Sequence, residues 1–385
     1  MNPVYLDHAA TTPLDARVIE AMQPFFGEHF GNASSVHALG RKARFAVEEC
    51  REKVAALLGA EPGEIVFTSG GTESNNMALG AASGDVLTCA AEHESVLRSA
   101  EALQSSGKTV HMLKPGRFGA VSMEDIARGL DSEACAGVTL VSIMHANNET
   151  GALSPVRQIA EACRARGLTF HCDAVQTVGY AMIPEADMMT LSGHKFYGPK
   201  GIGALFVRAG IDVGPVLLGG RQERGRRAGT ENVAAIAGFA KALKLAFDEG
   251  ESRKRHAEAM RERLRNGIQA VAGERVRIVT PCDTGEAAPH ILGVVAPPVN
   301  GYSMDGEMLL LNMDMENICV SAGSACTSGA LEPSHVLIAM GLDRAAAAAF
   351  LRFSVGRSTT DEDVDRAVEA FDRVLRRMIR MPETP

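Results

Sequence analysis

The sequence lacks any run of about 18 apolar residues, the length that a membrane-spanning helix requires. Its first residues, Met-Asn-Pro-Val-Tyr-Leu-Asp, also lack the basic and apolar regions of a signal peptide. Basic residues are not in excess, because 39 lysines and arginines stand against 47 aspartates and glutamates, a net charge of −8. Nucleic-acid-binding proteins normally show a basic face. We therefore expect a cytoplasmic protein that binds neither a membrane nor nucleic acid.

The cysteines form no Cys-x-x-Cys pair, which disfavours a metal site or a disulfide framework. We expect no metal and mostly buried, reduced thiols of the kind found in cytosolic proteins, with at most one or two that carry chemistry. The eight cysteines stand at positions 50, 89, 135, 163, 172, 282, 319 and 326.

Strand and helix patterns alternate through the first two thirds of the 385 residues. The composition, 46% hydrophobic and 22% charged, is ordinary for a soluble globular protein and excludes a disordered or collagen-like chain. Apolar strands that alternate with helices predict an α/β fold, in which a mostly parallel sheet carries helices on both faces. The predicted helices include 37–58 and 159–166, and the predicted strands are 65–67, 86–89, 110–113, 138–144, 168–172, 188–191 and 203–207.

A long helical stretch over residues 230–270 changes polarity near residues 249–251, and we place a domain boundary there. The remainder predicts a smaller α+β lobe, in which residues 345–349 are marked only as a stretch of small side chains. Its strands are expected at 275–279, 290–296, 317–321 and 351–355, and its helices at 303–312, 333–340 and 361–379.

Two polar residues close different predicted strands, where open parallel sheets bind their ligands. Lys195 follows strand 188–191 and is either a Schiff-base amine for a carbonyl cofactor or a solvated lysine in a turn. Asp173 follows strand 168–172 and either keeps a pyridinium nitrogen protonated or caps a helix. Gln176, three residues later, can donate a hydrogen bond. Lys195 and Asp173 together favour a pyridoxal phosphate site more than either residue does alone.

Two glycine-containing segments add a phosphate cradle and a thiol. Residues 69–76, which include Gly71 and Thr72, follow a strand and offer free N–H groups and a hydroxyl to a phosphate, with a capped helix start as the alternative. Residues 321–329 are small and glycine-flanked. Cys326 within them fits a nucleophile that travels between sites, and the alternative is an inert loop thiol.

Two further residues stand in chemically conspicuous places. His93 follows strand 86–89, although a lone histidine is more often structural than catalytic. Arg352 interrupts the apolar run 351–355, where it needs an anion. That anion is either a bound carboxylate or a buried ion-pair partner.

These motifs in this order resemble the cysteine desulfurases of the NifS/IscS type, class V aminotransferases with the pyridoxal phosphate fold type I. The resemblance covers nearly the whole chain. It implies a large domain at 15–252 and a small domain formed by 1–14 and 253–385, with a mobile cysteine loop at about 321–333. The matching segments are 5–13, 68–75, 145–151, 173–176, 192–195, 219–232, 323–329 and 351–354.

For the cofactor, the resemblance implies that Lys195 binds pyridoxal 5′-phosphate through a Schiff base and later moves the Cα proton. It implies that Asp173 contacts the pyridine nitrogen, that Gln176 contacts the ring hydroxyl, and that His93 stacks on the ring and acts as acid or base. The phosphate is expected to bind at Gly71, Thr72, Ser192 and His194 and at Thr230 of the partner subunit of a homodimer.

For the substrate, the resemblance implies that Asn148 and Arg352 bind the carboxylate of L-cysteine and that Cys326 takes its sulfur as a persulfide while alanine leaves. The sulfur would pass to an iron–sulfur cluster scaffold or another acceptor protein. Two alternatives stay open. One is a selenocysteine lyase or another lyase or aminotransferase of the same fold, and the other is a non-catalytic sulfur carrier or scaffold subunit.

Overall fold

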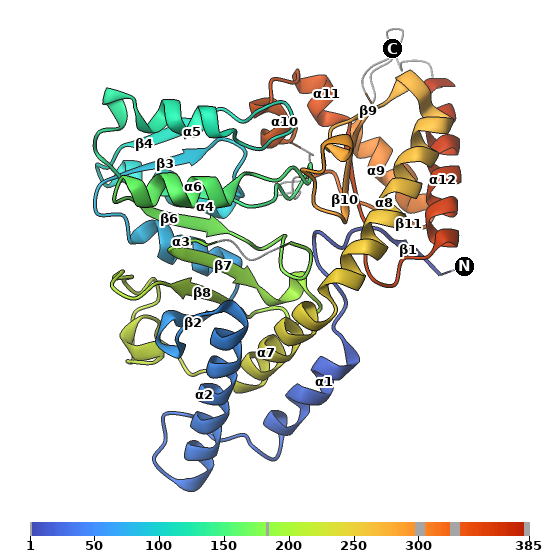
Figure 1. The fold of residues 1–385 in the computed structure, drawn as a ribbon. Coiled ribbons are helices and arrows are strands. Elements are labelled where there is room, and N and C mark those ends of the chain that lie inside the picture. The colour runs from blue at the N-terminus through green and yellow to red at the C-terminus, as the bar shows by residue number, and fades with distance from the viewer. Residues whose placement is uncertain (1, 182–184, 297–304, 324–331, 381–385) are drawn as a thin grey trace.

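A seven-stranded sheet forms the centre of the larger lobe in the computed structural model (Figure 1). The structure describes residues 2–181, 185–296, 305–323 and 332–380. Strand β8 is antiparallel to both of its neighbours, and the other neighbouring strands are parallel, so the prediction of a mostly parallel sheet is confirmed. The strand order is β2 (Ile65–Thr68), β8 (Gly203–Val207), β7 (Met188–Ser192), β6 (Thr169–Asp173), β5 (Val138–Met144), β3 (Asp85–Cys89) and β4 (Val110–Leu113).

Alternate side chains of each strand enter two apolar cores, one on each face of this sheet. In β5, Val141 and Ile143 belong to one core and Leu140 belongs to the other. Helices therefore cover both faces, as predicted. The face with Leu140 carries α3 (Gly71–Gly80) and α4 (Glu94–Ser105), and the opposite face carries α2 (Ala38–Leu58), α5 (Met123–Leu130), α6 (Val156–Ala165) and α7 (Val233–Asp248).

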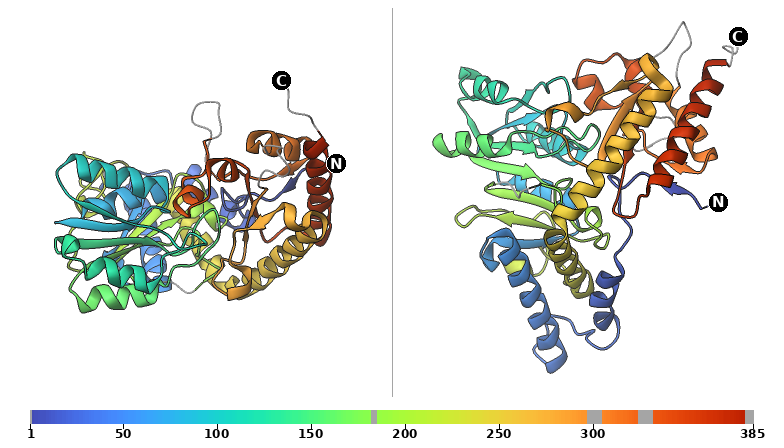
Figure 2. Two further views of the ribbon diagram at one scale, coloured as in Figure 1. Left: turned by 90° about the horizontal axis from the view of Figure 1, so that it is seen from above. Right: turned by 45° about the vertical axis from the view of Figure 1, so that its right-hand side comes forward.

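The smaller lobe, seen beside the larger one in Figure 2, is built on a three-stranded antiparallel sheet and a two-stranded parallel pair. In the parallel pair, β1 (Val4–Tyr5) lies beside β11 (Ile318–Cys319), so the start of the chain packs in this lobe. The predicted domain limits stay a prediction. The other elements are α8 (Gly250–Ala272), β9 (Arg277–Ile278), β10 (Ile291–Val295), α9 (Gly306–Met315), α10 (His335–Ala339), α11 (Arg344–Ala348), β12 (Phe350–Ser354) and α12 (Asp361–Arg380).

The apolar pattern of the sequence does not predict several short helices, among them α1 (Ala16–Met22), α5 and α11. They span too few turns to show a period of 3.6 residues, and their first turns are fixed by side-chain caps. Ser122 accepts from the N–H of the third residue of α5, and Asp343 does the same for α11, so the alanine-rich stretch is a helix and not only a run of small side chains. Within the described ranges, no helix combines the length and the apolarity needed to cross a membrane.

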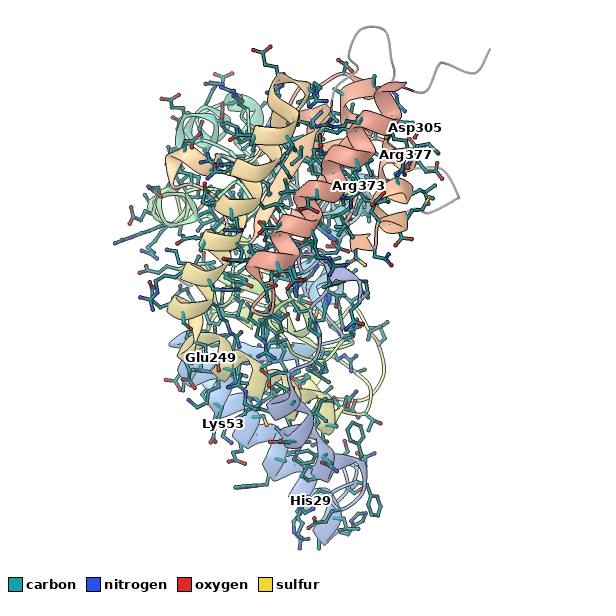
Figure 3. The ribbon with its side chains drawn as sticks, turned by 90° about the vertical axis from the view of Figure 1, so that its right-hand side faces the viewer. His29, Lys53, Glu249, Asp305, Arg373 and Arg377 are labelled. Atoms are coloured by element: carbon teal, nitrogen blue, oxygen red, sulfur yellow. The ribbon has the colours of Figure 1, made fainter. Side chains whose placement is uncertain are left out.

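The polarity change near residue 249 marks the junction of α7 and α8, where Glu249 is held by two arginines (Figure 3). Arg17 Nη1 donates to Glu249 Oε1 at 2.6 Å, and Arg253 Nη2 donates to Oε2 at 2.7 Å. Hydrogen bonding from Arg17 is the main cause of the lowered pKa of Glu249. This carboxylate therefore ties α1 to the first turn of α8.

The arginines of α12 do more than face solvent, which is their simplest interpretation from the sequence. Arg373 and Arg377, labelled in Figure 3, both donate to the carboxylate of Glu316 at 2.9 to 3.0 Å. Glu316 closes α9, so this triad joins α9 to the last helix.

A buried ion pair connects α2 to the turn at residue 223. Arg51 and Glu223 form two hydrogen bonds of 2.8 Å, and each side chain is 3% exposed. We expect Arg51→Met to lower the free energy of unfolding by about 3–5 kcal/mol, because it leaves the Glu223 carboxylate buried without its partner. Urea unfolding measures this change. Arg98→Met, which removes an exposed pair with Glu94 and Glu101, is the control and should cost less than about 1 kcal/mol. Equal losses for both variants would contradict the prediction.

Candidate active site

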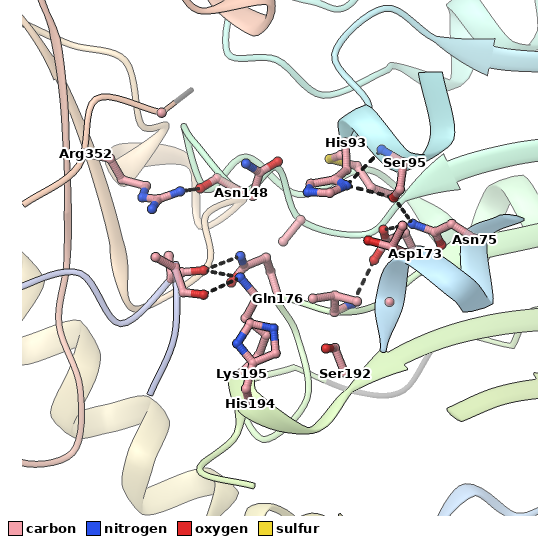
Figure 4. A pocket seen from close by; sticks show the side chains of 18 of the residues that line it. Asn75, His93, Ser95, Asn148, Asp173, Gln176, Ser192, His194, Lys195 and Arg352 are labelled. Carbon is pink, nitrogen blue, oxygen red and sulfur yellow. Dashed lines mark hydrogen bonds between the residues drawn. The ribbon is translucent and has the colours of Figure 1, made fainter. Parts of the chain in front are cut away.

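Five strands of the larger sheet point their carboxyl ends at one cavity of about 320 Å³. Because these strands run in the same direction, the residues that follow them meet at one edge of the sheet, as the sequence predicts. The predicted site residues that line the cavity are Gly71, Thr72, His93, Asn148, Asp173, Gln176, Ser192, His194, Lys195 and Arg352. Figure 4 shows most of them facing the same space.

Lys195 ends the short 3₁₀ turn that follows β7 and reaches across to the N-terminal segment of the chain. Its Nζ donates to the backbone oxygens of Ala9 and Ala10, at 2.5 and 2.9 Å (Figure 4). Removal from water and, to a smaller extent, the nearby Arg352 lower the pKa of this amine to about 8, against a smaller opposite effect of Asp173. About a tenth of the amine is thus unprotonated at pH 7, against less than about a thousandth for a lysine with the ordinary pKa of about 10.4, which favours the Schiff-base interpretation over the solvated lysine.

Asp173, the last residue of β6, is held by hydrogen bonds from two directions. The backbone N–H of Val175 donates to Oδ1 at 3.0 Å, and Asn75 Nδ2 donates to Oδ2 at 2.8 Å. The same Asn75 nitrogen lies 2.8 Å from Ser95 Oγ, which in turn lies 2.8 Å from His93 Nδ1 (Figure 4). Asp173 does not cap a helix here, because a turn follows it.

His93 combines both of its sequence interpretations. It is the N-cap of α4, because its Nδ1 accepts from the backbone N–H of Ser95 at 3.1 Å. Its ring also lines the cavity. A structural role and a place at the site are therefore compatible for this residue.

The start of α3 lines the cavity at Gly71 and Thr72, where the sequence predicts an anion cradle. The first N–H groups of a helix have no partner inside the helix and attract negative charge. A side chain at Gly71 would place its Cβ 3.1 Å from Val175 Cγ2 and 3.7 Å from Ser192 Cβ, so glycine keeps this part of the cavity open.

His194 lies with its Nδ1 3.1 Å from Thr11 Oγ1, and burial lowers the pKa of its ring to about 4.

Arg352 enters the cavity from β12 of the smaller lobe and is 4% exposed. Its Nη1 donates to the backbone oxygen of Asn148 at 2.8 Å, and its Nη2 forms an ion pair of 2.9 Å with Asp7. Its Nε is buried without a hydrogen-bond partner among the residues that the structure describes. The ion-pair interpretation is therefore correct, and these two contacts use only two of the five N–H donors that the guanidinium can offer to an anion.

Gln176 forms contacts through both the nitrogen and the oxygen of its side-chain amide. Its Nε2 donates to the backbone oxygen of Ala9 at 3.0 Å, and its Oε1 lies 3.3 Å from Nε2 of His290, whose ring stacks on Tyr180 at 4.4 Å. Gln176 therefore has a second amide hydrogen for a ligand in the cavity.

Two predicted residues do not meet the cavity in the described part of a single chain. Thr230 is exposed in the loop before α7 and is not among the lining residues. Cys326 lies outside the described residues, so its predicted role as nucleophile stays a prediction.

The structure also adds residues that the sequence does not single out. Asn75 and Ser95 lie inside segments that the sequence predicts to form the site. An asparagine and a serine do not by themselves indicate a site residue. Ala9 and Ala10 lie in segment 5–13, which carries the family resemblance, but the alanine side chains do not predict that their backbone oxygens bind Lys195. Spacing offers one hint, since Asn75 lies one helical turn beyond Gly71 on the same side of α3.

Comparison with known proteins agrees with this geometry. The family model for class-V aminotransferases matches residues 4–367. The chain is 40% identical over 393 aligned positions to a cysteine desulfurase of Trichormus azollae and 43% identical over 393 positions to the cysteine desulfurase IscS of Anaeromyxobacter sp. strain Fw109-5. Both alignments cover 98% of this chain and 94% of the relative. A solved NifS-like protein superposes with a TM-score of 0.87 at 35% identity, covers 97% of this chain and is itself 99% covered. The predicted fold is thereby confirmed.

Proposed function

We propose that this chain, which belongs to the class V aminotransferase family, is a cysteine desulfurase that removes sulfur from L-cysteine and releases L-alanine. The observation that carries the proposal is the convergence of Lys195, Asp173 and Arg352 on one cavity. They come from neighbouring strand ends of the larger lobe and from the smaller lobe. The two cysteine desulfurases named above align with 98% of this chain at 40% and 43% identity.

The residues of the cavity fit pyridoxal 5′-phosphate, the cofactor that this family implies. The fit rests on the Lys195 amine with its lowered pKa, the carboxylate of Asp173 and the open corner at Gly71 beside the start of α3. Lys195 would hold the aldehyde carbon, Asp173 the ring nitrogen, and the start of α3 with Ser192 the phosphate. When bound, the cofactor supplies an electron sink for the pair released at the substrate Cα.

Side chains of the protein would bind the substrate and carry out the proton and sulfur transfers. Arg352, through N–H donors that its contacts with Asp7 and Asn148 do not use, and Asn148 would bind the substrate carboxylate and fix the Cα next to Lys195. The neutral Lys195 amine would accept the Cα proton and return it. A thiolate of the protein would attack the substrate sulfur, so that an S–S bond forms, the Cβ–S bond breaks, and Cβ takes a proton to give alanine. Cysteine then loses one sulfur atom and the protein thiol gains it.

Cys326 is our proposed sulfur acceptor, and the other thiols support this by their chemistry. Each of the seven described cysteines has a raised pKa, with burial as the main cause. A thiol with a raised pKa is a poor nucleophile near neutral pH.

The proposal is tested by incubating the purified protein with L-cysteine and measuring alanine together with the mass of the protein. The expected result is stoichiometric alanine and one added sulfur atom per chain, located at Cys326 by peptide mass spectrometry. A colourless protein that forms no alanine after addition of pyridoxal phosphate would overturn the assignment and favour a non-catalytic carrier.

The lowered pKa of Lys195 predicts how fast the cofactor-free protein takes up pyridoxal phosphate at each pH. Only the unprotonated amine forms the bond, so the rate should rise about tenfold per pH unit below the pKa and level off above about 8. The absorbance of the bound cofactor measures the rate. Lys200→Ala, which removes an exposed lysine of the same turn, should leave the profile unchanged. A rate that levels off only near the ordinary lysine pKa of about 10.4 would contradict the prediction.

Arg352→Lys is expected to raise the KM for L-cysteine by about 10–150-fold, because a charged hydrogen bond of about 1.5–3 kcal/mol to the carboxylate is lost. The cofactor absorbance should not change. Steady-state alanine formation measures KM, and Arg357→Lys is a control that alters an arginine next to Tyr197 outside the cavity lining. An unchanged KM for Arg352→Lys would mean that this arginine serves only its ion pair with Asp7.

We further propose that the chain works as a homodimer in which Thr230 completes the cavity of the partner subunit. Large apolar side chains exposed on a single chain support a second copy, and they include Val36, Phe45 and Leu218 at 87%, 71% and 85% exposure. Sedimentation as a monomer with a full complement of cofactor would contradict this.

We propose the cytoplasm as its compartment, because the seven described cysteines are all free thiols. The sulfur would leave for an iron–sulfur cluster scaffold or another acceptor protein, since the IscS name is carried by relatives 39–43% identical to this chain.

A further inference from the structure

Asp173 is linked to His93 through hydrogen bonds of Asn75 and Ser95. The chemistry of these groups allows only one direction of donation along the series. An ionised carboxylate only accepts, so the group of Asn75 that faces Asp173 must be its NH₂. The second hydrogen of that NH₂ points to Ser95 Oγ, which therefore accepts. The single hydrogen of the Ser95 hydroxyl is then left for His93 Nδ1, 2.8 Å away.

The backbone fixes the same direction independently. The N–H of Ser95 is a donor in every protonation state, and it lies 3.1 Å from His93 Nδ1. A proton on Nδ1 would face both this N–H and the Ser95 hydroxyl hydrogen. Nδ1 must therefore keep its lone pair, and a neutral ring must carry its proton on Nε2.

We propose that Asn75 and Ser95 are positioning residues that hold neutral His93 as the Nε2–H tautomer, so that the histidine offers a hydrogen-bond donor to the cavity. The inference rests on the proposed function and assigns the proton roles at that same site. His93 can give a proton to a substrate group but cannot take one at Nε2. The base is then left to Lys195.

The groups around His93 are compatible with a neutral ring. Asp173 faces it from β6, Lys195 from the turn after β7, Glu94 from α4 and His335 from α10. Partial removal from water lowers the pKa of His93, and the nearby Asp173 opposes this less strongly. Asn75 and Ser95 are only 1% and 7% exposed, so most of each residue is shielded from water.

The tautomer can be measured directly on the purified protein, with and without pyridoxal phosphate, after labelling histidine with ¹⁵N. Long-range ¹H–¹⁵N spectra separate a protonated from an unprotonated ring nitrogen, and His93→Gln identifies the signals by their loss. We expect an unprotonated Nδ1 and a protonated Nε2 for His93. A protonated Nδ1 with a bare Nε2 would overturn the inference, whatever the protein does with cysteine.

Ser95→Ala tests the positioning role, and Ser99→Ala is its matched control. Ser99 also carries a buried hydroxyl on α4, but it donates to the backbone oxygen of Ser95 and does not contact His93. Ser95→Ala removes one of two donors to Nδ1, so the fraction of Nδ1–H tautomer should rise and kcat should fall about 3–10-fold with little change in KM. Ser99→Ala should keep the wild-type tautomer and kcat. If the two variants give the same tautomer ratio and the same kcat, Ser95 does not position His93.

The outcome is separable from that of the proposed function. The tautomer signals need no turnover, so a protein that forms no alanine but shows the Nε2–H tautomer would overturn the desulfurase assignment and leave the positioning by Ser95 in place.

Discussion

Replacing Lys195 by alanine is expected to lower kcat for alanine formation by at least about 10³-fold. The variant loses both the amine that would hold the cofactor covalently and the base that would move the Cα proton, and proton transfer by a positioned side chain alone contributes about 10²–10⁴-fold. The structure places this amine 2.5 and 2.9 Å from two backbone oxygens that keep it in the cavity. Rapid quantification of alanine under saturating cysteine measures the loss.

The matched control for this experiment is Lys200→Ala. Lys200 lies five residues further along the same glycine-rich segment and is exposed, so its removal should leave kcat within about twofold. Circular dichroism of both variants establishes that they fold. If Lys195→Ala retains more than a tenth of the wild-type rate, the amine of the reaction belongs to another residue.

Replacing Cys326 by serine is expected to abolish the persulfide and to lower alanine formation by at least about 10²-fold, while pyridoxal phosphate stays bound. Serine keeps the size of the side chain but offers a hydroxyl, which does not accept sulfur as a thiolate does. Intact-protein mass spectrometry after addition of L-cysteine measures the persulfide, and the visible spectrum measures the cofactor.

Cys319→Ser controls for a general effect of losing a thiol. Cys319 lies in β11, close to Cys326 along the chain, and burial raises its pKa. This variant should form the persulfide at the wild-type level. Unchanged turnover in Cys326→Ser would mean that this thiol is not the sulfur acceptor, and a selenocysteine lyase would then be the better description.

Residues that close strands could be predicted because the rule that governs them is local. A strand of four to seven residues can be recognised from its apolar side chains, and a parallel sheet brings the carboxyl ends of its strands together. Lys195 and Asp173 can therefore be identified from the sequence, and they lie at the same edge of the sheet because β6 and β7 are parallel neighbours.

Other parts of the site depend on contacts that no local pattern carries. Asn75 meets Asp173 across 98 residues of sequence, and its amide looks like any other polar residue on a helix. The oxygens that hold Lys195 belong to alanine backbones. Short helices such as α11 depend on a cap more than on a period, so the apolar pattern passes over them. Thr230 is exposed and does not line the cavity of its own chain, so its predicted place in the cavity of a partner subunit stays a prediction.

The N-terminal segment has a consequence for the order in which the protein is made. Asp7 binds Arg352, and the backbone of His8 binds that of Ser354, so this segment must wait during synthesis for partners about 345 residues later. At roughly 5–20 residues per second, that interval is on the order of 20–70 seconds. Ala9 and Ala10, which hold the amine of Lys195, belong to this waiting segment. A nascent chain therefore acquires its complete cavity only after residue 352 has been made, and premature termination before that residue leaves an unfinished pocket.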